Sequence, residues 1–387
     1  MKNIAIISFI KSYNYGASLQ GYALWHAITH ILHFNGKCQY LNYRRDYKPD
    51  FIVWLARKIS SAVLRRDDTP SYTCREILQE YLLARKDVVT YSDELERRFE
   101  TFWNLMPYTE PVKKGQLRNL NEVFDTFIVG SDQVWNPGKV NLDCTYLLDF
   151  VSDGNKKFSY ASSLGMKQIP LKYRKSYRTY LSRFNSISVR EKASVGIIKE
   201  LLSEDKNIAS HCDPTLLLDF DAWNQISQNN KPDITNYVLV YDLTGKDKMC
   251  NQIANLIAEK RNLNVYTVSQ ENGHGPLEWL QLFINADYVV TNSFHGTAFS
   301  LNFSKEFIAL IPQIEMFEKS KDRIFGILQG VGLDERVFSE KVFEEKTSDE
   351  IWNLLCGLKE IDTSELQSRL LSVRNEGLDY LRKCVND

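Results

Sequence analysis

The amino-acid sequence predicts an α/β protein made of two Rossmann-like domains that face a cleft. Short β-branched or aromatic runs alternate with helical patterns along most of the chain, and this alternation is typical of parallel sheets covered by helices on both faces. Segments such as Tyr237–Tyr241 are apolar throughout, as expected of a strand buried on both faces. A polar, loop-like run at 227–233 separates two series of such strands.

The length of the chain also favours more than one domain. Its 387 residues correspond to two or three domains of ordinary size. We expect an N-terminal Rossmann-like domain over residues 1–225, a C-terminal one over 226–345, and helices over 346–387 that pack back on the body. In such sheets ligands bind at the carboxyl ends of the strands, so we expect the ligand in the cleft between the domains.

Individual elements follow from local patterns. The predicted strands are Ile4–Ile10, Cys38–Tyr43, Thr126–Gly130, Phe158–Ala161, Ser186–Val189, Tyr237–Tyr241, Val265–Val268, Tyr288–Thr291 and Phe307–Ile311. The predicted helices are Leu19–Leu32, Leu171–Arg183, Lys192–Leu202, Asp247–Arg261 and Leu277–Ile284, with further helices toward the C-terminus.

Charge and cysteine content exclude several classes of protein. Lys and Arg number 48 against 49 Asp and Glu, whereas a dedicated nucleic-acid binder has a strong basic excess. The seven cysteines are scattered without a CxxC pair, which argues against a zinc ribbon and suggests a reducing compartment. The N-terminal apolar run breaks at Lys11 without a small-residue cleavage site, so we predict a strand rather than a signal peptide. We expect a cytoplasmic protein without a metal site.

The first loop, Ser12–Gln20, leaves the first predicted strand and opens a helix. Gly16 allows a close approach of the backbone, and Ser18 is a candidate N-cap residue. Free N–H groups at a helix start can bind an anion. The candidate substrate-binding residues of this loop are therefore Asn14, Tyr15, Gly16 and Ser18. An ordinary turn between strand and helix is the alternative.

Residues 50–66 predict a basic amphipathic helix, with apolar side chains at helical spacing and Trp54 nearby. Such a helix can lie on an anionic membrane surface, which here would be the inner face of the membrane. The alternative, which we favour, is a helix packed on its own protein with solvated basic side chains.

Polar residues follow the strand predicted at Thr126–Gly130. Asp132 and Gln133 come at its carboxyl end, the functional edge of a parallel sheet. Trp135 is a candidate for stacking on a sugar ring, and burial in the core is its alternative. Asp132 is equally well explained as a turn residue.

Arg190 follows the strand predicted at Ser186–Val189 and points toward the same edge of the sheet. Its planar guanidinium can hold a carboxylate or a phosphate through two hydrogen bonds. A salt bridge to an acidic residue is the alternative, and residue type alone favours it. A little further on, Asp213 precedes Pro214 and is expected to shape a turn.

The strongest candidate motif is Ala286–Ala298, where a strand runs into Asn292 and Ser293 and a helix opens near His295 and Gly296. A histidine at a helix N-terminus can meet an anion and exchange a proton with it. Gly296 removes side-chain bulk where a ligand would approach. A histidine that merely caps the helix is the alternative.

Taken together, these segments resemble the polysaccharide pyruvyl transferase family. They occur in the family's order over about residues 13–340 and are Asn14–Gln20, Val129–Asn136, Phe158–Gly165, Ile187–Glu191, Cys212–Leu216, Asn292–Gly296 and Asp322–Ile324. Each segment is weakly specific alone, whereas the ordered set is specific.

The resemblance implies a GT-B-like fold and the transfer of pyruvate from phosphoenolpyruvate to a glycan or lipid-linked sugar in polysaccharide biosynthesis, as in an exopolysaccharide. It implies His295 as the catalytic acid, Arg190 as an anion-binding residue, and no cofactor besides the donor. Some members carry an arginine directly before the histidine, where this chain has Phe294. Arg323 is a candidate substitute for that charge, and a surface ion pair is its alternative role.

The chemistry of these residue types agrees with the resemblance. Arginine and helix N-termini bind carboxylate and phosphate groups, and the pKa of histidine suits an acid catalyst near neutral pH. Two other functions stay open. One is a glycosyltransferase that uses a nucleotide sugar, since folds of this kind host that chemistry. The other is a non-catalytic saccharide-binding protein, which Phe294 in place of arginine favours.

Overall fold

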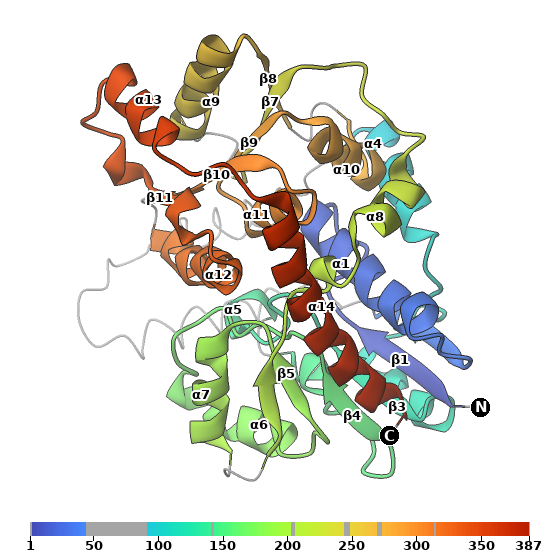
Figure 1. Ribbon diagram of the computed structural model, residues 1–387. Helices are drawn as coiled ribbons and strands as arrows, with labels where there is room; N and C mark the ends of the chain where they lie inside the picture. Colours follow the sequence, from blue (N-terminus) through green and yellow to red (C-terminus); the bar gives the residue numbers. More distant parts are fainter. Residues whose placement is uncertain are drawn as a thin grey trace, which may run out of the picture.

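The computed structural model describes residues 2–43, 91–140, 143–202, 206–243, 248–268, 273–312 and 315–386, with the side chains of 315–322 excepted. These residues form two main parallel sheets flanked by helices (Figure 1). The helix predicted over 50–66 lies outside the described residues, as does the membrane contact assigned to it. No described helix is both long and apolar enough to span a membrane.

The first domain is built around strands β1 (Asn3–Ile7), β2 (Lys37–Tyr40), β3 (Thr126–Val129) and β4 (Lys156–Ser159). Their order is β2-β1-β3-β4, and every neighbouring pair is parallel. Strands β5 (Ile187–Val189) and β6 (Ile208–Ser210) also pair in parallel and adjoin β4 through a bridge between Phe158 and Ser186. Its helices include α1 (Tyr15–His26), α4 (Asp93–Trp103), the short α5 (Pro137–Val140), α6 (Leu171–Leu181) and α7 (Lys192–Leu201).

The second domain repeats this plan. Its strands are β7 (Tyr237–Tyr241), β8 (Asn264–Thr267), β9 (Tyr288–Thr291), β10 (Glu306–Ile311) and β11 (Val337–Ser339), in the parallel order β11-β10-β9-β7-β8. Helices α9 (Lys248–Arg261), α10 (Pro276–Asn285), α11 (Phe294–Asn302) and α12 (Glu315–Val331) connect them. Because crossover helices cover both faces, the strands are apolar throughout, as β7 shows.

The two domains share one hydrophobic core. Val238 and Val240 of β7 pack in a cluster with α9, while Leu239 faces α10 and α11 on the other side. That second cluster continues into the first domain, where it includes Ile4 of β1 and Leu19 of α1. The domains are therefore joined by continuous apolar packing rather than by a linker alone.

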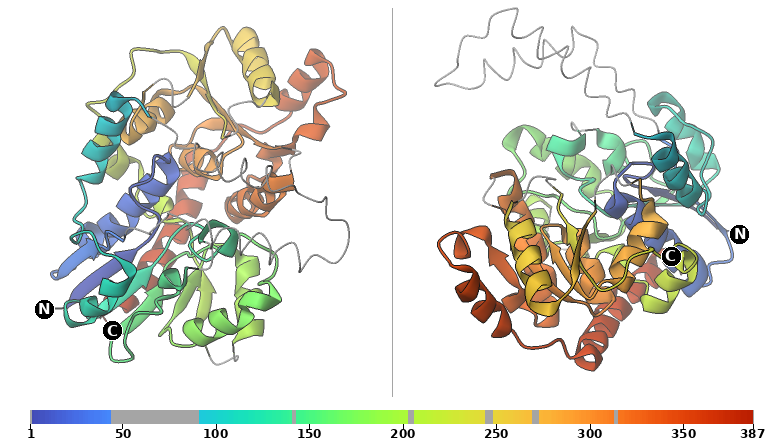
Figure 2. Two further views of the ribbon diagram at one scale, coloured as in Figure 1. Left: turned by 180° about the vertical axis from the view of Figure 1, so that it is seen from behind. Right: turned by 90° about the horizontal axis from the view of Figure 1, so that it is seen from above.

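The C-terminal helices complete this connection. Helix α13 (Ser348–Cys356) packs on α9, and α14 (Thr363–Asn386) runs from the second domain to the first (Figures 1 and 2). The Arg374 guanidinium donates to the backbone carbonyl of Leu216, and the Tyr380 hydroxyl donates to that of Ser159. Helix α8 (Phe220–Ser227), although it precedes most of the second domain in sequence, packs on α10.

The strand orders place the functional edge of each domain. In the first sheet the order reverses between β1 and β3, and in the second between β7 and β9. Ligands bind to doubly wound sheets in the crevice at such switch points. The loops that matter are therefore those after β1, β3, β7 and β9.

The predicted fold class and all the predicted strands are confirmed, with strand ends shifted by a few residues. Two three-residue strands, β6 and β11, were not predicted, because so short a run carries little pattern. The first helix begins at Tyr15, four residues earlier than predicted, and the predicted cap was wrong. Asn14 is the N-cap residue, since its Oδ1 accepts a hydrogen bond from the Ala17 N–H at 2.9 Å.

Candidate active site

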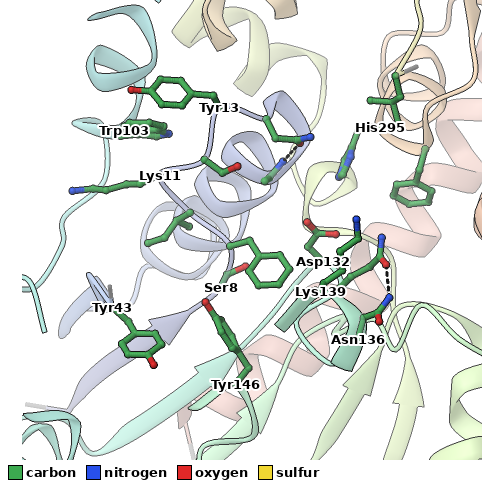
Figure 3. A pocket seen from close by; sticks show the side chains of 18 of the residues that line it. Ser8, Lys11, Tyr13, Tyr43, Trp103, Asp132, Asn136, Lys139, Tyr146 and His295 are labelled. Carbon is green, nitrogen blue, oxygen red and sulfur yellow. Dashed lines mark hydrogen bonds between the residues drawn. The ribbon is translucent and has the colours of Figure 1, made fainter. Parts of the chain in front are cut away.

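A cavity of about 1520 Å³ lies between the two domains (Figure 3). It is lined by the loops after β1, β3, β7 and β9, as the switch points predict. Among the candidate site residues, those that line it are Asn14, Asp132, Gln133, Ser293, His295 and Arg323. The cleft expected from the sequence is therefore formed, and residues from both domains meet in it.

His295 occupies the first turn of α11. The hydroxyl of Ser293 caps that helix by accepting a hydrogen bond from the Gly296 N–H at 3.2 Å. The imidazole packs directly against Gly16 at the start of α1, where a side-chain Cβ would lie 2.0 Å from Nδ1 of His295. The starts of α1 and α11, which come from different domains, therefore touch at the histidine.

A buried ionic cluster lies beneath the imidazole. The Asp213 carboxylate, fully buried, accepts a hydrogen bond from Nη1 of Arg190 at 2.7 Å. The same oxygen, Oδ2, lies 3.9 Å from Nε2 of His295. Arg190 and His295, predicted from separate motifs, therefore share one carboxylate. Nε2 of His295 has no hydrogen-bond partner among the described residues.

Arg190 is surrounded by carboxylates more closely than the sequence suggested. Its Nη2 lies 3.7 Å from Asp132, and its Nε lies 3.4 Å from Glu191. Only 4% of its side chain is exposed. The salt bridge that residue type favoured is present, so Arg190 holds the cluster together and has little surface left for a ligand.

These contacts shift the pKa values of the cluster. Burial lowers the pKa of His295, and the carboxylates of Asp213 and Asp132 only partly oppose this. Burial by itself raises the pKa of Asp213, but the Arg190 guanidinium, His295 and the Thr215 N–H together outweigh it and hold the pKa below its ordinary value. The site therefore keeps Asp213 ionised and makes His295 a stronger acid than usual once it is protonated.

Phe294 lies at the position where some members of the family that the sequence resembles have an arginine. Its ring faces the Arg190 guanidinium, whose carbon Cζ lies 4.7 Å from the ring centre. Arg323 lies on the same ring at 6.0 Å and lines the cavity. Arg323, the candidate substitute for that charge, therefore lies beside Phe294 at the cavity, and both guanidinium groups are within cation–π range of the ring.

Several candidate residues lie outside the cavity, and these assignments are corrected. Trp135 is fully buried, with its Nε1 donating to the Tyr146 carbonyl. Tyr15 is buried against Trp279, and its hydroxyl donates to the carbonyl of His274. Both side chains serve the core instead of a substrate, because an aromatic ring next to a strand end fills the space between layers.

Three smaller candidates also have structural roles. Ser18 is buried and accepts a hydrogen bond from Nε1 of Trp103 at 3.0 Å. Asn292 is buried, and its side chain accepts from the Leu243 N–H and donates to Asp242. Gly296 leaves room for Thr291, whose Oγ1 would lie 2.3 Å from an added Cβ, and not for a ligand.

Asp213 is the main functional residue that sequence reasoning missed, because its turn beside Pro214 was a sufficient explanation. Its Oδ1 does accept the Thr215 N–H in that turn, at 3.1 Å. The signal in the sequence was its place in Cys212–Leu216, one of the segments that carry the family resemblance. Lys139 in α5, which lines the cavity, was missed as well.

The fold and the site together define the class of protein: a GT-B-like α/β protein whose candidate site lies between two Rossmann-like domains. The family model described as polysaccharide pyruvyl transferase matches residues 14–313. The chain therefore belongs to the polysaccharide pyruvyl transferase family and is a transferase. No curated protein sequence matches it significantly.

Several solved structures are distantly similar to this chain in fold. The N-terminal domain of trehalose-6-phosphate phosphatase from Candida albicans is similar at 10% identity, with 100% of this chain and 96% of that chain covered and a TM-score of 0.46. UDP-GlcNAc 2-epimerase from Neisseria meningitidis is similar at 11% identity, with 96% and 100% covered and a TM-score of 0.42. ADP-heptose lps heptosyltransferase II from E. coli gives 10% identity, 96% and 99% coverage and a TM-score of 0.36. Likenesses this distant carry no argument about the reaction.

Proposed function

We propose that this transferase moves pyruvate from phosphoenolpyruvate onto two hydroxyls of a saccharide or lipid-linked sugar, as a cyclic ketal. The observation that carries the proposal is the meeting of His295, Asp213 and Arg190 at a cavity that further cations line. Membership of the family supports pyruvyl transfer, and the chemistry of the cavity supports an anionic donor.

The donor would bind at the end of the cavity that holds His295. Arg323 and Lys139 bring positive charge to the cavity, and charge-assisted hydrogen bonds to carboxylate and phosphate are strong. Helices α1 and α11 both begin at the cavity, so their N-terminal dipoles also favour an anion. In this proposal Arg323 contacts the donor, and Arg190 acts through Asp213.

His295 would act as the general acid. It donates a proton to the terminal enol carbon, which becomes a methyl group and leaves an oxocarbenium-like centre on the neighbouring carbon. One acceptor hydroxyl attacks that centre and returns its proton to His295. A second hydroxyl then replaces the phosphate, whose C–O bond breaks, and its proton leaves with the phosphate.

The atoms and charges of this sequence balance without an oxidant or reductant, so the proposal includes no cofactor. Negative charge on the bound donor raises the pKa of the nearby imidazole and so favours the protonated form that the first step requires. We also propose a cytoplasmic location, in keeping with the free thiols of the described cysteines.

Incubation with phosphoenolpyruvate and a panel of sugars tests the proposal. We expect release of inorganic phosphate together with an acid-labile, carboxylated sugar detected by mass spectrometry. The His295→Ala variant is expected to lose at least about a hundredfold in rate, the usual contribution of a general acid. A variant that melts like the wild type and keeps its rate would remove His295 from the mechanism. His30→Ala, on the exposed surface of the π-helical turn after α1, is the matched control.

A further inference from the structure

The cavity is larger than the proposed donor needs. Its volume of about 1520 Å³ exceeds the roughly 300–1000 Å³ of pockets that hold drug-sized ligands. A three-carbon donor beside His295 leaves most of this space empty. The inference below rests on the proposed function in one respect, namely that a second substrate must occupy the remainder.

The remainder is walled by aromatic side chains. Phe9, Tyr13, Tyr43, Trp103 and Tyr146 line the cavity and are called the aromatic wall here. Figure 3 shows Tyr13, Trp103, Tyr43 and Tyr146 on the side of the cavity away from His295. Phe9, Tyr13 and Tyr43 are partly exposed, so their rings are accessible to a ligand.

The rings of the aromatic wall are held in place by their neighbours. Tyr13 packs on Trp103 with ring centres 5.3 Å apart, and Nε1 of Trp103 donates to Ser18. On the other side, the Tyr43 hydroxyl donates to Asp143 at 2.8 Å, and its ring lies 6.3 Å from that of Tyr146. A ligand that stacks on rings fixed in this way loses little binding energy to ordering them.

Polar groups accompany the rings. The amide side chains of Asn42 and Asn104 line the same cavity, where they can donate to and accept from hydroxyl groups. Those of Gln133 and Asn136 also line it but are bonded to each other at 2.8 Å. Lys11 and Glu100 line it with opposite charges. A saccharide has an apolar C–H face and a rim of hydroxyls, and aromatic rings with amides complement both.

We infer that the aromatic wall is the acceptor subsite and binds uncharged hexopyranose rings, which stack on Tyr13 and on Tyr43. The acceptor would then lie with its hydroxyls directed toward the donor at His295. Binding in this subsite depends on ring faces, and the cationic end of the cavity does not contribute to it.

Saturation-transfer NMR with methyl hexopyranosides tests the inference on the full chain, since it reports sugar binding without turnover. Tyr13→Leu and Tyr43→Leu keep side-chain bulk but remove the ring face, and each is expected to weaken binding about tenfold, as for other aromatic contacts. Tyr13→Phe keeps the ring and its packing on Trp103 and is expected to bind normally. Tyr173→Leu, on α6 outside the cavity, is the control. Melting curves show that each variant is folded.

The outcomes separate this inference from the proposed function. Unchanged sugar binding in both leucine variants would overturn the acceptor subsite, whatever the donor is. If sugar binding falls in these variants but phosphoenolpyruvate gives no turnover in the wild type, the subsite stands and the proposed donor is wrong. If turnover occurs, the leucine variants should raise the KM for the sugar and leave that for phosphoenolpyruvate within about twofold.

Discussion

At the scale of single residues, the position of His295 depends on the absence of a side chain at position 16. The imidazole fills the space beside Gly16, and a Cβ there would lie within 2.0–2.5 Å of three of its ring atoms. The ring belongs to the first turn of α11 and not to either sheet. The glycine therefore matters more for activity than for folding.

We predict that Gly16→Ala displaces the imidazole and reduces the rate of transfer by about a hundredfold, because small misplacements of a catalytic group are costly. The melting temperature should change little. Steady-state kinetics and thermal unfolding on the same sample check this. Gly115→Ala, where an added Cβ meets nothing within 4 Å, is the control. A fully active Gly16→Ala enzyme would mean that His295 does not need this position.

The pH dependence of the reaction should report the pKa of the His295 imidazole. Burial holds the pKa of the imidazole below its ordinary value of 6.5 in the free enzyme, and the general acid must be protonated. We therefore predict that kcat/KM falls as pH rises through a pKa below 6.5. Donor binding adds negative charge and raises this pKa, so kcat should hold to higher pH than kcat/KM.

The Asp213→Asn variant removes the largest influence that raises the pKa of His295. The fall of kcat/KM with rising pH should then begin at a lower pH than in the wild type. An unchanged pH profile would show that Asp213 does not act on the histidine. The sequence predicted His295 and Arg190, but it could not predict that Asp213 joins them, because burial and contacts between separate motifs are invisible in a local pattern.

At the scale of elements, α11 carries His295, the proposed general acid, on a helix start that Ser293 caps. Loss of an N-cap hydroxyl typically costs about 1 kcal/mol. The exposed cap of α13 offers a comparison, since Oγ1 of Thr347 accepts the Glu350 N–H at 3.3 Å. The two helix starts are alike in chemistry but differ in their distance from the cavity.

We predict that Ser293→Ala and Thr347→Ala each lower the free energy of unfolding by about 1 kcal/mol. Only Ser293→Ala should also lower kcat, because it loosens the turn that positions His295. Denaturant unfolding and kinetics of both variants check this. Equal activity in the two would show that the cap of α11 is purely structural.

Prediction of elements succeeded where the pattern was long and failed where local chemistry competed. The strands were recognised from continuous apolar runs such as that of β7. The first helix was started too late because Ser18 and Asn14 are both good caps, and their choice depends on the backbone. In the structure Ser18 is buried behind Trp103, a contact from a distant helix that no local rule supplies.

At the scale of the whole molecule, binding of the donor should stabilise the fold. A ligand at a hundredfold excess over its Kd contributes about 2.7 kcal/mol, so phosphoenolpyruvate should raise the melting temperature. Arg323→Ala should reduce this gain, and added salt should weaken it through screening. Stabilisation by UDP- or GDP-sugars without any effect of phosphoenolpyruvate would favour a glycosyltransferase instead.

The division into two domains was predictable because the sequence contains two separate series of apolar strands, one for each sheet. The packing of one domain on the other was not, since Ile4, Leu19 and Leu239 share a cluster only once both domains are folded. Helix α14 was expected to pack on the body, but its contacts with both domains depend on polar side chains such as Gln367, which donates to the carbonyl of Asn302, and Tyr380, which donates to that of Ser159.

The path of α14 has a consequence for how substrates reach the cavity. A hinge motion that swung the domains apart would have to break the hydrogen bonds of Asn302 on α11, which donates to the carbonyls of Thr215 and Leu218 and accepts from Arg374 of α14. It would also expose the apolar cluster between the sheets. Such opening is energetically unfavourable, so we expect the distance between the two domains to stay fixed. Donor and acceptor must therefore diffuse into a preformed chamber, and dyes placed on the two halves should report a single separation, with or without ligand.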